Sequence, residues 1–153
     1  MLQRLKYCFL VFIVISITSY SFVINYEKVY SISEIDSTIV SATNVKSLDI
    51  KISPSVSPIK SQDEIKFKIT FLQPNSDKIQ VHVDYDFIVF LDGDEIFSAS
   101  KQTGQPLLHT AEGTVTIPYS FLSSGLYIVK ISVLGINFVP INPESADFTF
   151  QVS

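Results

Sequence analysis

From residue 44 onward, apolar and polar residues alternate with a period of two, which is typical of β-strands that bury one face. The longest such run is residues 119–133, where a turn at residues 123–125 leads directly into a strand. Its apolar set falls on one face: Tyr127, Val129, Ile131 and Val133. A central strand of a two-sheet sandwich has this pattern, so the rest of the domain is predicted to pack against it.

Shorter alternating runs predict the remaining strands, at residues 45–53, 65–71, 79–87, 95–99, 113–117 and 146–152. Asp92-Gly93 is a strong signal for a hairpin turn. Residues 135–144, which hold Pro140 and Pro143, predict a long final loop. Together these elements predict an all-β, antiparallel sandwich of about seven or eight strands, with no helix in the domain itself.

A hydrophobic leader precedes this domain. Arg4 and Lys6 are followed by a run from Tyr7 to Tyr26 without any charge, long enough to span a bilayer as a helix. The run predicts either a signal peptide cleaved near Ser21 or a retained signal anchor, with the body outside the cytoplasm. The chain therefore divides into a leader (1–26), a stalk or linker with room for one irregular strand (27–43), and the β domain (44–153).

Charge and cysteine content exclude several function classes. The net charge is −4 and no basic patch occurs, which argues against nucleic acid as a partner. The single cysteine, Cys8, lies in the leader. The domain consequently has no disulfide, no thiol nucleophile, no zinc-thiolate site and no blue-copper site.

The approach to the long strand also carries a family pattern. Ser123-x-Gly125-x-Tyr127-x-Val129 resembles the approach to the penultimate strand of immunoglobulin-like and PKD-like sandwiches in exported archaeal or bacterial surface proteins. This resemblance implies an immunoglobulin-like fold over residues 44–153. It also implies structural roles for Gly125 and Tyr127, with the tyrosine hydroxyl bonded back to the preceding loop. Val129 stands where antibody domains carry a cysteine, and the resemblance implies no particular function.

Five acidic residues lie within a short stretch and no lysine or arginine separates them: Asp84, Asp86, Asp92, Asp94 and Glu95. Asp84 and Asp86 are expected on the outward face of one strand, and the other three at the hairpin. Carboxylates near a turn suit Ca²⁺, which takes six to eight oxygen ligands. The alternative is a solvated hairpin tip whose charges prevent pairing between sheet edges.

The two histidines, His82 and His109, are the second candidate site. His82 and Asp84 share a strand face, and imidazole nitrogens are suitable copper ligands if the two rings meet in space. The alternative is that His109, a loop histidine after Leu107 and Leu108, is a structural group hydrogen-bonded to the backbone.

A partner surface is the third candidate, because Ile88 and Phe90 are apolar residues out of phase with their strand. The apolar residues of the final loop, such as Phe138 and Val139, are instead expected to cover the core. No nucleophile elbow, metalloprotease helix or phosphate loop occurs, which argues against an enzyme. The sequence thus predicts a non-enzymatic extracytoplasmic sandwich, membrane-anchored or secreted, that contacts a cell-envelope or surface protein. The alternative is an exported domain that binds calcium or copper.

Overall fold

The computed structural model describes residues 37–153, so the leader and its predicted helix lie outside the described residues. Of the described residues 61% are in strands and 4% in a helix. None of these residues belongs to a helix long and apolar enough to cross a membrane. The elements are β1 (Ile39–Ala42), β2 (Asp49–Pro54), β3 (Glu64–Leu72), β4 (Val83–Leu91), β5 (Asp94–Ser98), α2 (Ala99–Thr103), β6 (Leu108–Thr110), β7 (Thr114–Ser120), β8 (Gly125–Ile136) and β9 (Val139–Val152).

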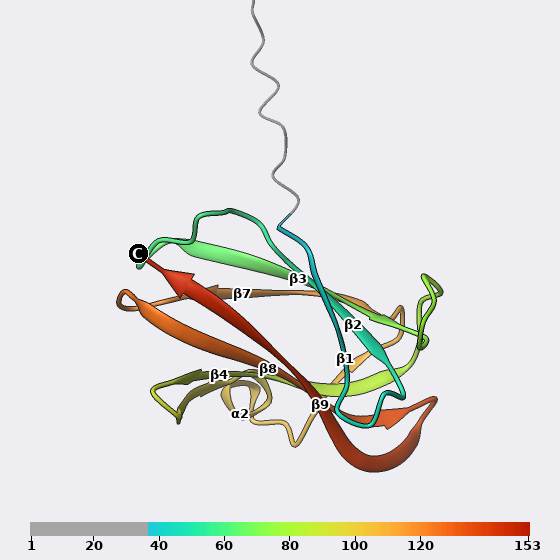
Figure 1. Ribbon diagram of the computed structural model, residues 1–153. Coiled ribbons are helices and arrows are strands. Elements are labelled where there is room, and N and C mark those ends of the chain that lie inside the picture. Colours follow the sequence, from blue (N-terminus) through green and yellow to red (C-terminus); the bar gives the residue numbers. More distant parts are fainter. Residues whose placement is uncertain (1–36) are drawn as a thin grey trace, which may run out of the picture. The chain divides into compact units, whose positions relative to one another are not determined.

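The strands form two antiparallel sheets that face each other as two layers (Figure 1). One sheet has the order β1-β2-β3-β7. The other has the order β5-β4-β8-β9, and β6 pairs with β4 beside β5. The predicted all-β sandwich is thereby confirmed. β1 falls within the segment predicted as a stalk, and it pairs with β2 along its whole length.

The core lies between the two sheets and consists of their inward faces. Phe67 of β3 is its centre, with ring centroids 5.6 Å from Phe87, 5.2 Å from Phe150 and 6.1 Å from Phe121. The predicted inward residues of β3 and β8 are buried without exception: Ile65, Phe67, Ile69, Phe71, Tyr127, Val129, Ile131 and Val133. Aromatic rings supply much of this burial, so the domain reaches a dense core without a disulfide.

Tyr127 fixes the entry to β8. Its ring is buried against Phe121, with 4.6 Å between ring centroids. Its hydroxyl donates a hydrogen bond of 2.9 Å to the carbonyl oxygen of Ser123, four residues upstream. The bond satisfies the only polar atom of a buried side chain and holds the turn that precedes the strand.

The strand predicted at 79–87 is displaced. It begins at Val83, because His82 adopts a positive φ of 52° that interrupts the extended chain. The alternation over residues 79–87 would place Ile79 and Val81 inward, but both precede the strand and are exposed. β4 continues to Leu91, and its pairing with β5 shifts register between Val89 and Phe90, which marks a bulge.

The predicted final loop is wrong. β8 and β9 form one long hairpin, in which Ile136 pairs with Val139 across a two-residue turn. Both turn residues, Asn137 and Phe138, have positive φ, as a tight type I′ turn requires. Phe138 is 69% exposed and Val139 is 60% exposed, so these side chains do not cover the core.

A helix also occurs where none was predicted. α2 follows β5 and lies against the outer face of β4. Ser98 caps its N-terminus by accepting from the Lys101 amide, and Gly104, with a φ of 69°, ends it. A single turn of this kind carries too few residues for a recognisable helical period.

We expect Tyr85 to make the protein less stable above pH 10. Burial, followed by the Asp86 carboxylate, raises the pKa of Tyr85 from 10.0 to about 12. Between those pH values the unfolded chain ionises this tyrosine and the folded chain does not, so the stability present below pH 10 is lost as pH rises. Urea midpoints at pH 8 and pH 11 should fall less between the two for Tyr85→Phe than for the wild type. Equal falls would contradict the expectation.

Candidate functional site

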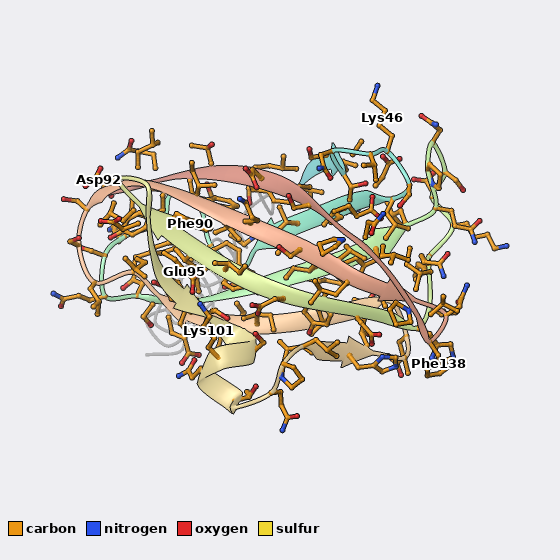
Figure 2. The ribbon with its side chains drawn as sticks, turned by 90° about the horizontal axis from the view of Figure 1, so that it is seen from below. Lys46, Phe90, Asp92, Glu95, Lys101 and Phe138 are labelled. Atoms are coloured by element: carbon orange, nitrogen blue, oxygen red, sulfur yellow. The ribbon has the colours of Figure 1, made fainter. Side chains whose placement is uncertain are left out.

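The acidic residues do not gather at one place. Asp84 is near the start of β4, and Asp92 follows its end, eight residues later. At the usual rise of a strand this separates the two carboxylates by about 26 Å. Figure 2 accordingly shows Asp92 and Phe138 at opposite ends of the domain. At the hairpin, Asp92 and Asp94 are exposed, and Glu95 forms an ion pair of 2.6 Å with Lys101.

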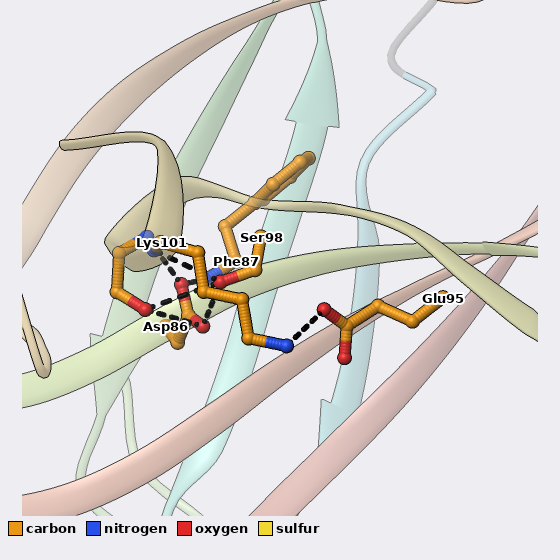
Figure 3. Close-up of polar contacts among 6 residues, drawn as sticks. Asp86, Phe87, Glu95, Ser98 and Lys101 are labelled. Atoms are coloured by element: carbon orange, nitrogen blue, oxygen red, sulfur yellow. Dashed lines mark hydrogen bonds and ion pairs between the residues drawn. The ribbon is translucent and has the colours of Figure 1, made fainter. Parts of the chain in front are cut away.

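Asp86 is an internal structural group. It lies on the outward face of β4, as predicted, but the residues that start α2 bury it to 7% exposure. Its carboxylate accepts from the amides of Phe87 and Ser100 at 2.8 and 2.9 Å (Figure 3). The hydroxyls of Ser98 and Ser100 donate to its other oxygen at 2.7 and 2.8 Å. Four donors occupy both oxygens, so Asp86 ties α2 to β4 and is not free to bind an ion.

The calcium prediction is therefore supported by fewer neighbouring carboxylates than the sequence suggested. Within residues 37–153, no three His, Cys, Asp or Glu side chains are arranged to hold a metal ion together. Asp92, Asp94 and Glu95 remain neighbours at an exposed hairpin tip, a placement that also blunts the edge of β5. Calcium binding by these three residues stays a prediction.

The two histidines, by contrast, lie side by side. The ring centroids of His82 and His109 are 5.8 Å apart. Nδ1 of His109 lies 2.7 Å from Oδ1 of Asp84, its partner in the β4–β6 pairing. Phe138, at the turn between β8 and β9, lies 4.3 Å from the His82 ring and 5.5 Å from the His109 ring. Three separate segments thus meet at one end of the five-stranded sheet.

Two glycines permit this arrangement. A Cβ at Gly135 of β8 would overlap the carboxylate of Asp84. A Cβ at Gly113 would overlap the carbonyl of Gln80, two residues before His82, and Gly113 also has a φ of 71°. The close approach of β8 to the Asp84 carboxylate, and of Gly113 to the Gln80 backbone, therefore depends on residues without side chains.

Ile88 and Phe90 lie at the other end of β4, on the outer face of the sheet. They are half-buried and lie opposite Lys130 and Ile128 of β8. The Lys130 ammonium is 5.0 Å from the centroid of the Phe90 ring, which places both on the same face. On this face Leu126 is 58% exposed and Ile128 is 39% exposed. We name these four residues the outer apolar strip: Ile88, Phe90, Leu126 and Ile128.

Sequence reasoning missed half of this strip. The alternation of β8 puts Ile128 on the outward face, but nothing in the sequence connects it with Phe90, because the register between β4 and β8 is not visible in either strand alone. Leu126 directly precedes the inward-facing Tyr127. Since successive side chains of a strand alternate, its position indicates the outward face and could have added it to the strip.

A scan against protein-family models and searches of the curated proteins and of the solved structures found no match to this chain.

We expect Asp86→Asn to destabilise the fold by about 1–3 kcal/mol, because an amide cannot accept from all four donors that surround Asp86. Asp94→Asn, at the exposed hairpin tip, is the matched control and should change stability by less than about 0.5 kcal/mol. Urea denaturation of both variants provides the measurement. Similar stability of the two variants would show that the buried network is not needed.

Proposed function

We propose that this chain is a non-enzymatic, extracytoplasmic β-sandwich that works through contact with another protein of the cell envelope or surface. The observation that carries the proposal is the outer apolar strip on the face of the five-stranded sheet. The non-enzymatic part rests on the sequence, which carries no recognisable catalytic motif.

The immunoglobulin-like or PKD-like class is part of this proposal. The strand order supports it, since β2-β3-β7 face β5-β4-β8-β9 and the chain crosses between the sheets after β3, after β6 and after β7. The Tyr127 hydrogen bond to Ser123, at the start of β8, supports it as well. Domains with this architecture commonly present a sheet face or their loops to partners, although the fold itself names no partner.

The outer apolar strip has the composition and arrangement of a protein contact surface. Its four members lie on two adjacent strands and are directly paired at Phe90 and Ile128. Charged groups border it: Lys130 lies within 4.0 Å of Asp147, and Glu95 pairs with Lys101. An apolar centre with a polar rim is the usual anatomy of a protein interface. The partner surface should therefore present apolar side chains at its centre.

The extracytoplasmic location rests on the leader. Residues 1–26 carry a basic start and an uncharged run, and the acidic body has no basic patch with which to dock on anionic lipid. Membrane contact is accordingly assigned to the leader, either before cleavage near Ser21 or permanently as an anchor.

We expect the double variant Leu126→Ser/Ile128→Thr to reduce partner capture by about tenfold or more, because each change removes roughly 1 kcal/mol of apolar burial. The measurement is cross-linking of the full-length protein in its native envelope, with partners quantified by mass spectrometry. Leu122→Ser, at an exposed turn residue outside the strip, is the matched control and should retain capture. Equal capture by both variants, with unchanged melting temperatures, would overturn the docking face.

We also expect the body to be reached by protease added outside intact cells, with the N-terminus either intact or trimmed near Ser21. Terminal peptides read by mass spectrometry check both points. A body that is protected until the cells are lysed would rule out the extracytoplasmic assignment, because its leader would then not direct export.

A further inference from the structure

The paired imidazoles of His82 and His109 form a small built site at the end of the sheet where β4 begins. We propose that this site binds a late first-row transition-metal ion, with Cu²⁺ the best fit. The inference is independent of the outer apolar strip, because the strip centres on Phe90, toward the opposite end of β4.

The distance between the rings is suitable for a shared ion. A metal–imidazole bond is about 2.0–2.1 Å long, which puts the ion about 3 Å from each ring centroid. Two rings can therefore share one ion only if their centroids are about 6 Å apart or less. The observed separation of 5.8 Å meets this limit. The rings are stacked with an angle of 27° between their planes, so they must turn about their side-chain bonds for one nitrogen of each to point at the ion.

Asp84 prepares His109 as a ligand. An ionised carboxylate only accepts hydrogen bonds, so Nδ1 of His109 donates across the 2.7 Å contact and the lone pair of the neutral ring lies on Nε2. A carboxylate behind a metal-binding histidine is a recurrent arrangement that fixes the ring and raises its basicity. The His109 side chain is 36% exposed, which leaves a path for an ion from solvent.

His82 carries an unmet polar requirement. Its Nδ1 is buried and has no hydrogen-bond partner, the single such side-chain atom among residues 37–153. A buried polar atom without a partner costs about 1–3 kcal/mol. The positive φ of His82 adds backbone strain, of a kind that concentrates at functional sites. An ion bound to Nδ1 itself would supply the partner that this atom lacks.

The surroundings hold the backbone at His82 in place. The backbone amide of Asn137 donates to the carbonyl of His82 at 2.8 Å, and the amide of His82 donates to the carbonyl of Ala111 at 3.3 Å. Phe138 packs against both imidazoles. The backbone at His82 is thus fixed before an ion arrives, and only side-chain torsions have to change, which limits the loss of conformational freedom on binding.

The ligand set selects the ion. Two neutral nitrogens suit copper, nickel and zinc, and do not suit calcium or magnesium, which take oxygen ligands. With no third His, Cys, Asp or Glu of residues 37–153 placed to complete the site, solvent supplies the remaining ligands. Intrinsic affinities of divalent ions rise to a maximum at Cu²⁺, so copper should bind most tightly.

The test is titration of the full-length protein with Cu²⁺, followed by electron paramagnetic resonance. We expect one bound ion whose spectrum shows coupling to imidazole nitrogen, and a rise in the melting temperature. The variant His82→Asn/His109→Gln should lose this ion. Asparagine is chosen at position 82 because it tolerates positive φ. Asp84→Asn should weaken binding by about 10–100-fold.

Several controls keep the outcome decisive. Asp94→Asn should bind copper like the wild type, and melting without copper shows whether each variant folds. Copper that stays on the double-histidine variant, for example at Cys8, is background and is subtracted. If the folded double variant binds as much copper as the wild type, or the spectrum lacks imidazole coupling, the site is wrong. If Zn²⁺ binds more tightly than Cu²⁺, the assignment of the ion is wrong.

Discussion

The structure depends on burying two apolar sheet faces against each other. No disulfide joins the sheets in the described domain, because its sequence from residue 37 onward has no cysteine. Phe67 of one sheet packs on Phe87 and Phe150 of the other, and Phe71 packs on Tyr85 across the same core. Every strand must therefore keep its period-two pattern, since a slip of one residue would move its apolar set to solvent.

The outer face of β4 takes no part in this packing between the sheets. Its residues have three different surroundings. At the start of the strand, Asp84 engages His109. In the middle, Asp86 is sealed under α2 by four hydrogen bonds. Toward the end, Ile88 and Phe90 belong to the outer apolar strip. Neighbouring residues on one face of β4 thus differ in burial because different segments cover them. The strand conformation does not explain the difference.

The sequence was sufficient for the features that depend on one strand at a time. The inward faces of β3 and β8 and the Asp92-Gly93 turn follow from period and turn chemistry. Features that depend on register were out of reach. His82 and His109 meet only because β6 pairs with β4 and because the β8–β9 turn folds beside them. Residues 135–144 were predicted as a loop because they contain two prolines. The prediction failed because β9 is an edge strand, and edge strands tolerate proline.

The long β8–β9 hairpin also affects how the chain must be made. β9 pairs with β8 from Val139 to Val152, and it is synthesised after every other strand that the structure describes. Until it emerges, β8 lacks one neighbour and the inward side chains of β9 are missing from the core. Domains generally fold as whole units during synthesis. The nascent chain should thus remain open until translation of β9 is complete.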